Sequence, residues 1–319
     1  MATSGTTSYS VTELDVITTA MQDAGIIGAA DTTINSDDYD VARRKLNMLI
    51  KQWASQIDFA PGLKMWTRRR GFLFLQSNQV AYSLGPSGDE CAADSYVTST
   101  LASSASGGAG TVTLVSATGF AASMRIGVLL DSGAFQWTTI NGAPAGAVVT
   151  LTATLTGAAS AGARVFAYTS KVQRPFEIIT ASLHDTAGTD TTMLASSILE
   201  DYEAIMTKTA DGTPQSLYFE AQRTNAKVYL DCQPSDLTDV IRFVYYAYIE
   251  DMSATTNDVD MPAEWFRPLA AQLTIDLCPA FGRSVTPEMK FARDEALTIA
   301  KNAYPERITA EYQNCPDDY

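Results

Sequence analysis

Residues 66–85 read WTRRRGFLFLQSNQVAYSLG, and the spacing of apolar side chains changes within this stretch. Upstream of Trp66 the apolar residues recur every three or four positions, which is typical of helices. Downstream they follow a strand-like pattern in 71–75 and 79–84, on either side of the polar turn 76–78. The chain is therefore predicted to change from helical to β structure near residue 67.

Two helices are predicted on the N-terminal side of this change. Ser10 and Glu13 have the spacing of a capping box with Ser10 as the N-cap, and Gly25 ends the first helix. Asp37 and Asp38 mark the start of the second helix, because acidic side chains are favoured near a helix N-terminus. The apolar stripes of the two helices consist of Leu14, Ile17, Met21 and Ala24, and of Leu46, Leu49, Ile50 and Trp53. The solvated outer face of the second helix is expected to carry Arg43, Arg44 and Lys45.

The composition shifts to Ala, Gly, Ser and Thr between about residues 92 and 170. The charged residues of this stretch are Asp94, Arg125, Asp131 and Arg164. Five short strands are predicted at 111–115, 125–130, 135–140, 148–151 and 164–168, separated by Gly, Pro or Asn. Their spacing indicates an inserted module with the fold of a small β-barrel or β-sandwich.

Strands are predicted again at 176–183, 217–220, 227–231 and 240–249, with a short helix from Ser197 to about Thr207 that opens on a second capping box. A helix then starts with Pro262 at its first position and continues to Phe281 and Gly282. The last helix starts near Pro287, and its stripe of mostly small apolar side chains consists of Ala292, Ala296, Ile299 and Ala303.

These patterns predict an α+β fold in four parts. Residues 1–66 and 258–305 form a discontinuous helical bundle domain built from both chain ends. Residues 67–91 and 171–257 form a β-rich middle domain, residues 92–170 the inserted β module, and residues 306–319 an extended C-terminal tail. The β parts are then one long excursion from the helical domain.

The charge of the chain limits the partners that it can have. Its formal net charge is −14, which opposes wrapping of nucleic acid in a basic groove. The first ten residues lack the basic start and apolar run of a secretory signal, and no apolar stretch is long enough for a membrane span, so synthesis in the cytoplasm without membrane contact is expected. Four scattered cysteines indicate neither a zinc site nor a disulfide framework.

Motifs for catalysis or cofactor binding are absent from the sequence. His184 is the single histidine, which excludes most zinc sites, and no nucleophile elbow accompanies it. The glycine-rich residues 106–110 precede a strand and so lack the helix N-terminus that would hold a phosphate. The acidic pairs 37–38, 200–201 and 317–318 lie at helix starts or in the tail, where acids are common. No enzyme activity, metal or cofactor is therefore predicted.

The order of many weak motifs resembles a family of structural phage proteins. In the N-terminal part these motifs are Ala24-Gly25-Ile26, residues 34–38, residues 46–50 and Trp53-Ala54. In the middle they are residues 82–86, Gly88-Asp89, Arg174-Pro175, residues 217–219 and Tyr229-Leu230, and near the C-terminus they are residues 261–265 and Phe281-Gly282. This series is similar to the head-to-tail adaptors of short-tailed bacteriophages, also called tail accessory factors or packaged-DNA stabilisation proteins.

The resemblance implies a ring, commonly a dodecamer, that docks under the portal protein at the head vertex and is followed by the tail nozzle. Double-stranded DNA would pass through the ring without sequence-specific binding, and the copies would be assembled in the host cytoplasm into the virion. The inserted module departs from the family pattern. Three roles for it stay open: widening the ring, holding a neighbouring tail protein and presenting a surface to the host.

The C-terminal tail is the predicted portal-docking segment, because it combines an extended pattern with apolar anchors. These anchors are Tyr304, Ile308, Tyr312 and Tyr319. Two alternatives to the adaptor remain: a tail-associated carbohydrate-binding or depolymerising β protein, and a cytosolic enzyme whose site the sequence does not reveal.

Overall fold

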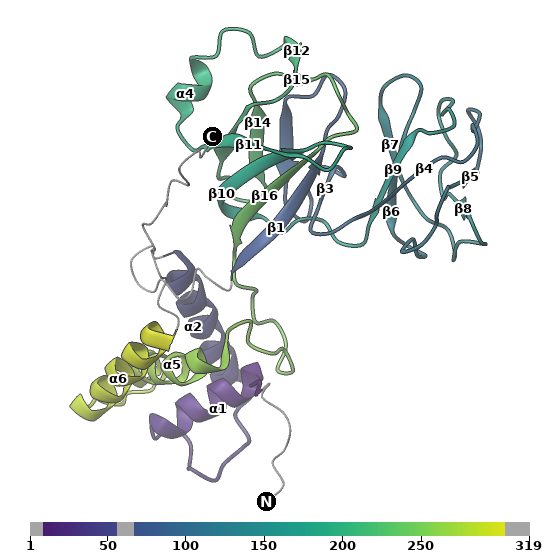
Figure 1. Ribbon diagram of the computed structural model, residues 1–319. Helices are drawn as coiled ribbons and strands as arrows, with labels where there is room; N and C mark the ends of the chain where they lie inside the picture. Colours follow the sequence, from purple (N-terminus) through teal and green to yellow (C-terminus); the bar gives the residue numbers. More distant parts are fainter. Residues whose placement is uncertain (1–8, 56–66, 304–319) are drawn as a thin grey trace, which may run out of the picture. The chain divides into compact units, whose positions relative to one another are not determined.

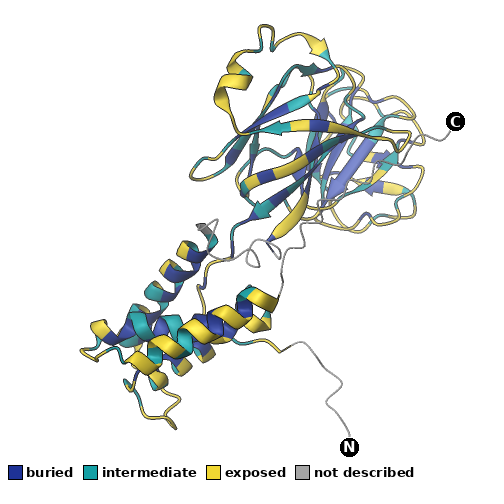
Figure 2. Ribbon diagram, turned by 60° about the vertical axis from the view of Figure 1, so that its left-hand side comes forward, coloured by how far each residue is buried: buried dark blue, intermediate teal, exposed yellow. Residues whose placement is uncertain are grey.

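The computed structural model describes residues 9–55 and 67–303 (Figure 1). Contacts divide the chain into two compact units. The helical unit is built from the part of the chain before Arg68 and the part from Ile249 on, and the β unit is Arg68–Tyr248. In both units the buried residues line the facing sides of helices and strands (Figure 2).

The helical unit combines helices from both ends of the chain. They are α1 (Glu13–Asp23), α2 (Ser36–Ser55), the 3-10 helix η1 (Ala263–Trp265), α5 (Phe266–Ala280) and α6 (Pro287–Ala303). Helices α1, α2 and α6 all contact α5. Their apolar stripes meet in one core that includes Ile17, Met21, Leu46, Ile50, Trp53, Trp265, Leu269 and Leu273. Trp53 and Trp265 meet edge to face with ring centroids 5.9 Å apart, so the N- and C-terminal segments share this core.

Polar side chains of α2 also hold the C-terminal segment. The amide of Asn47 donates to the carbonyl of Met252 and accepts from its N–H, both at 2.8 Å. Lys51 Nζ donates to the carbonyl of Ile249 at 2.6 Å, and Lys45 Nζ donates to the carbonyl of Asp276. The prediction of a solvated outer face is therefore wrong for Lys45, whose long side chain reaches a backbone carbonyl of α5. It is also wrong for Arg43, whose Nε donates to the buried carboxylate of Glu13 on α1, whereas Arg44 is exposed.

The first turn of α1 has a partner for each of its N–H groups. Thr12 is the N-cap, and its hydroxyl accepts from Asp15 N while the Asp15 carboxylate accepts from Thr12 N. The N–H groups of Glu13 and Leu14 donate to the carbonyls of Asn257 and Thr255. The predicted capping box at Ser10 is wrong by two residues, because this pairing with 255–257 fixes where the helix begins.

The β unit contains an eight-stranded sheet in the order β2-β14-β13-β11-β10-β16-β1-β3, which is nearly closed into a barrel. Its strands are β1 (Arg68–Phe74), β2 (Ala81–Leu84), β3 (Ala92–Ala93), β10 (Pro175–His184), β11 (Asp190–Ser196), β13 (Ser216–Glu220), β14 (Ala226–Leu230) and β16 (Val240–Ala247). Neighbours pair antiparallel except β11 and β13, which are parallel. A two-stranded ladder of β12 (Asp211–Gly212) and β15 (Gln233–Pro234) lies beside it.

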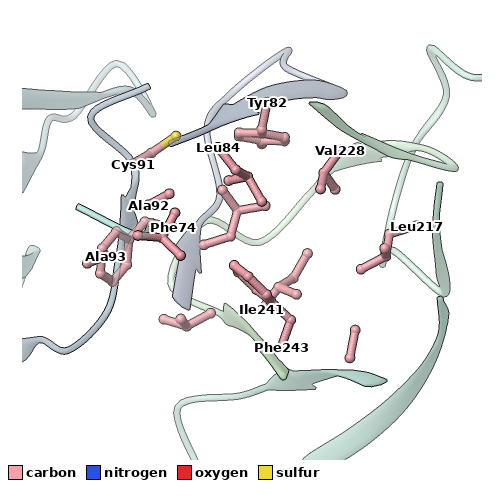
Figure 3. Packing of buried hydrophobic residues seen from close by; sticks show 14 of the residues in the cluster. Phe74, Tyr82, Leu84, Cys91, Ala92, Ala93, Leu217, Val228, Ile241 and Phe243 are labelled. Atoms are coloured by element: carbon pink, nitrogen blue, oxygen red, sulfur yellow. The ribbon is translucent and has the colours of Figure 1, made fainter. Parts of the chain in front are cut away.

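The inner face of this sheet carries the largest core of the β unit. Figure 3 shows Leu84, Val228, Ile241 and Phe243 gathered with other buried side chains of this core. Gly71 is paired with Phe243, and a Cβ at Gly71 would collide with the phenyl ring. Glycine is therefore required where β1 passes this ring.

The stretch between β3 and β10 forms a separate set of strands. A four-stranded antiparallel sheet has the order β4-β9-β6-β7, from β4 (Val97–Thr100), β6 (Arg125–Leu129), β7 (Phe135–Thr139) and β9 (Arg164–Tyr168). β5 (Thr111–Thr113) and β8 (Val148–Thr150) form a two-stranded sheet. Both sheets share a core that includes Leu101, Leu114, Ile126, Val149 and Val165. The five strands predicted here are confirmed, and the short β4 was not predicted.

Several predicted details are wrong. The helix expected from Ser197 to Thr207 is only α4 (Leu199–Glu203), with Ile198 as an N-cap that makes no side-chain hydrogen bond. Pro262 precedes the helical residues as the N-cap of η1 and is not the first of them. On α6 the buried residues are Ala296, Leu297 and Ala300, whereas Ile299 is exposed, so the predicted stripe is turned by about one position.

Candidate assembly surfaces

His184, the single histidine of the sequence, lies in the β unit beside an acidic partner. His184 Nδ1 lies 2.7 Å from Asp190 Oδ1 on the neighbouring strand β11, and this carboxylate lies 3.4 Å from Arg242 NH1. Asp185, its neighbour in sequence, instead accepts from Thr189 N. Within 9–55 and 67–303 no group of three His, Cys, Asp or Glu side chains could hold a metal ion.

The three cysteines in the described part of the chain are free thiols. Cys91 and Cys278 are buried, and burial raises the pKa of the Cys91 thiol. Burial and the nearby Asp231 raise the pKa of Cys232 to about 11. Cys91 and Cys232 therefore stay protonated at neutral pH and are poor nucleophiles.

The predicted portal-docking residues lie outside the described residues. Helix α6 ends at Ala303, and Tyr304, Ile308, Tyr312 and Tyr319 follow it. The predicted role of these residues in docking stays a prediction.

A groove of about 660 Å³ runs between α1 and α5 in the helical unit. Its wall is mostly apolar or small, through Leu14, Thr18, Phe266, Ala270 and Ala292. Charged residues on its wall are Asp15, Asp23 and Arg267. The small residues of α5 and α6 leave this space open, because alanine side chains do not reach across to α1.

Apolar side chains also face solvent on the outside of these helices. Phe291 and Ile299 of α6 are 71% and 58% exposed, and Met48 of α2 is 62% exposed. Met48 lines a second, smaller groove of about 400 Å³ with Leu49, Ile275, Pro279 and Val285. The helical unit thus carries both apolar projections and apolar recesses that residues 9–55 and 67–303 do not fill, which is typical of a surface that meets another protein.

The β unit has a comparable apolar patch around α4. Leu194, Ile198, Leu199 and Met206 are exposed, with Met206 almost completely so. The ring of Tyr218 stacks on those of Tyr202 and Tyr229, with centroids 5.5 and 5.8 Å apart, and Lys208 Nζ lies over the Tyr202 ring. The α4 loop is thus anchored on the sheet by aromatic contacts while its apolar side chains remain accessible (Figure 2).

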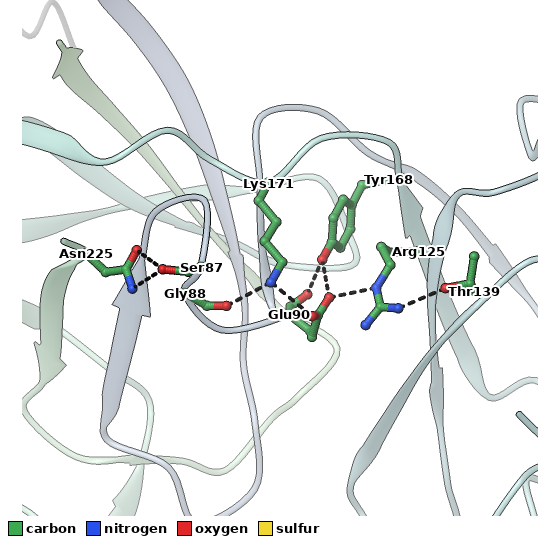
Figure 4. A network of polar contacts seen from close by, with 8 residues as sticks. All are labelled: Ser87, Gly88, Glu90, Arg125, Thr139, Tyr168, Lys171 and Asn225. Carbon is green, nitrogen blue, oxygen red and sulfur yellow. Dashed lines mark hydrogen bonds and ion pairs between the residues drawn. The ribbon is translucent and has the colours of Figure 1, made fainter.

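Glu90 joins the eight-stranded sheet to the inserted module (Figure 4). Its carboxylate accepts from Arg125 Nε at 2.7 Å, Lys171 Nζ at 2.9 Å and Tyr168 Oη at 3.1 Å. Burial alone would raise the pKa of Glu90, but the hydrogen bonds from Lys171 and Arg125 outweigh it, so the pKa is lowered. An aromatic contact lies close by, since Phe74 of β1 stacks on Phe166 of β9 at 4.6 Å.

Sequence reasoning did not find the grooves or the Glu90 contacts. Grooves arise where distant helices meet, so no local pattern encodes them. For Glu90 a signal did exist: Arg125 is one of only four charged residues between 92 and 170, and an isolated charge in such a stretch usually has a partner.

No helix in the described part of the chain has the length and apolar character to cross a bilayer. Comparisons with known proteins give no further guide to function. No family model matches the sequence, and a search of curated proteins finds no match.

Proposed function

We propose that this protein is a non-enzymatic head-to-tail adaptor of a phage virion. Copies form a ring, commonly of twelve, that docks under the portal protein, connects it to the tail nozzle and retains and passes the packaged DNA. The helices form the bundle that builds the ring, and the inserted strands form a small barrel or sandwich beside the eight-stranded sheet. The ordered sequence motifs support this proposal.

The observation that carries the proposal is the apolar surface of the helical unit that the described residues leave unfilled. A ring needs two different surfaces on each copy, one for each neighbour. The helical unit has an apolar projection at Phe291 and Ile299 and a recess between α1 and α5. A neighbouring copy is the occupant proposed for this recess, because each copy then offers both a projection and a recess.

The net charge of −14 is compatible with a DNA channel. Acidic groups repeated around a ring repel phosphates within a screening length of about 8 to 10 Å. DNA would then slide past the wall without adhering to it.

Electron microscopy of the purified protein, alone and mixed with the portal protein of the same phage, tests the proposal. Rings stacked coaxially on the portal are expected. The variant Phe291→Ala should raise the concentration needed for ring formation by at least about tenfold, because a large apolar side chain at an interface centre typically contributes this much.

Lys290→Ala is the matched control, because it truncates a long exposed side chain of α6 at the position directly before Phe291. It should leave ring formation unchanged, and circular dichroism should show native helix content for both variants. A chain that stays monomeric with and without the portal would refute the adaptor. A carbohydrate-binding tail protein would then be tested on glycan arrays.

A further inference from the structure

A groove on the β unit has features of a small-molecule site. It has a volume of about 540 Å³, within the range of about 300 to 1,000 Å³ that is usual for ligand sites. Its floor is formed by β10, β16 and β1, which are adjacent in the sheet. Ser95 and Tyr96, where the chain enters the inserted module, form part of its wall.

Strand register places the polar groups of the floor in two rows. Ser182, Arg242 and Phe72 are paired across the three strands in one row, and Thr180, Val244 and Arg70 in the next. Directly paired residues point to the same face of a sheet, so both arginines face the groove with the two hydroxyl groups. Phe72 meets Tyr96 edge to face at 4.9 Å, which places an aromatic wall beside them.

The two arginines have unused hydrogen-bonding capacity. Arg242 NH1 lies 3.4 Å from both oxygens of Asp190, longer than a strong charge-assisted hydrogen bond. Arg242 Nε is buried without a hydrogen-bond partner in the described part of the chain. Arg70 likewise has no partner among residues 9–55 and 67–303. Of the two guanidinium groups, only that of Arg242 lies near a carboxylate of a described residue, and this carboxylate of Asp190 is also engaged by His184.

From this arrangement we infer that the groove binds an acidic sugar unit, a sugar phosphate or a sugar carboxylate. Arg70 and Arg242 bind the oxyanion, since a guanidinium fork matches phosphate and carboxylate oxygens. Thr180, Ser182 and Ser95 exchange hydrogen bonds with sugar hydroxyls, and Tyr96 packs against the apolar side of the ring. A long nucleic acid is disfavoured, because the chain carries a net charge of −14.

Isothermal titration calorimetry with the full chain tests this site, using glucose 6-phosphate, glucuronate, glucose and inorganic phosphate as probes. Saturable binding of at least one acidic sugar is expected, with glucose at least about tenfold weaker because it lacks the oxyanion. Arg70→Gln should weaken acidic-sugar binding by about tenfold or more. Arg242→Lys, which keeps the charge but loses the fork, should also weaken it.

Arg69→Gln is the matched control, because Arg69 is the preceding residue of β1 and does not line the groove. It removes the same charge and should change affinity by less than about twofold. Ser182→Ala provides a second variant of the groove that keeps every charge, and thermal unfolding checks that all variants are folded.

Three results would overturn the inference. One is the absence of saturable binding of either acidic sugar at up to about 10 mM. Another is equal weakening by Arg69→Gln and Arg70→Gln, which would show a general effect of charge. The third is binding of inorganic phosphate or a short DNA duplex that is tighter than that of the sugars and sensitive to Arg70→Gln, which would assign the groove to a different anion.

Discussion

The helical unit buries a carboxylate beside a cation, whereas the β unit buries one beside other acids. Glu13 is fully buried, and its Oε1 accepts from Arg43 Nε at 2.6 Å and from Tyr39 Oη at 2.9 Å. Asp239 is nearly as buried, but the charges that act on it include those of Asp236 and Asp185, and it makes no hydrogen bond with the described residues.

The two environments shift the pKa values of Asp239 and Tyr39. Burial and the nearby acids raise the pKa of Asp239 from 3.8 to about 6, although His184 opposes this shift. In the helical unit burial raises the pKa of Tyr39 to about 12, so Tyr39 stays a hydrogen-bond donor to Glu13. The buried carboxylate of Glu13 therefore contributes to holding α1 on α2 in the helical unit. The buried carboxylate of Asp239 instead opposes folding of the β unit.

Removing the cation from the helical unit should have the largest effect. Arg43→Ala leaves the Glu13 carboxylate buried with only Tyr39, and we expect a loss of about 3 kcal/mol in the free energy of unfolding. Urea unfolding followed by the helical circular dichroism signal measures it. Arg44→Ala, an exposed neighbour on α2, should change stability by less than about 0.5 kcal/mol. Equal effects of the two variants would show that the Glu13 pair does not stabilise α1 on α2.

The opposite sign is expected for the buried acid of the β unit. Asp239→Asn removes a charge that folding desolvates, and should stabilise the protein by about 2 kcal/mol at pH 7. Because the folded-state pKa is raised, the wild type loses stability as pH rises from about 4 to about 6. The advantage of the variant should thus vanish near pH 4 and be complete above pH 6. Thermal unfolding between pH 4 and pH 8 checks this, and an advantage that does not change with pH would contradict it.

A smaller loss of stability is expected from removing the N-cap of α1. Thr12→Ala removes the hydroxyl that accepts from Asp15 N and should cost about 1 kcal/mol, measured by urea unfolding. Thr12→Ser keeps the hydroxyl and is the control. Ser10→Ala tests the cap that the sequence suggested, and a loss for Ser10→Ala as large as for Thr12→Ala would contradict the observed cap.

The smallest effect is expected at Glu90. Its side chain is about one-third exposed, so water screens its ion pairs, and Glu90→Gln should cost less than about 1 kcal/mol at pH 7. Because its pKa is lowered, this contribution is present above pH 4.5 and is lost as pH falls through the folded-state pKa. The unfolding temperatures of the two proteins should therefore converge once the pH falls below the folded-state pKa of Glu90. Glu220→Gln, a carboxylate of β13 that accepts from Tyr229, is a control outside the module contact.

The sequence predicted the larger elements of the fold because their patterns are local. The change of period after Trp66, the acids at the start of α2 and the Gly-separated strands of the inserted module are all observed. β11 was missed because its polar sequence DTTMLAS has no strand pattern, and its pairing with β10 and β13 determines it instead. Ser10 and Thr12 are both followed by an acid three residues later, so only the contact with residues 255–257 decides between them.

The candidate surfaces were less predictable than the elements. Ile299 fits a helical apolar stripe in sequence, yet the packing of α6 on α5 turns it outward. Arg70 lies in a run of three arginines, but its place beside Arg242 follows from a register between strands about 170 residues apart. Such features depend on pairing across the whole chain, which a single sequence does not display.

The split of the helical unit between the two chain ends has a consequence for protein synthesis. Helix α2 ends at Ser55, and α5 begins at Phe266, roughly 210 residues later. At about 5 to 20 residues per second, a ribosome needs roughly 10 to 40 s to make this interval. During that time Leu46, Ile50 and Trp53 lack the α5 side chains that cover them in the finished chain. The nascent chain therefore exposes this apolar face of α2 for a longer time than most small domains do. It is a good substrate for chaperones that bind emerging polypeptides.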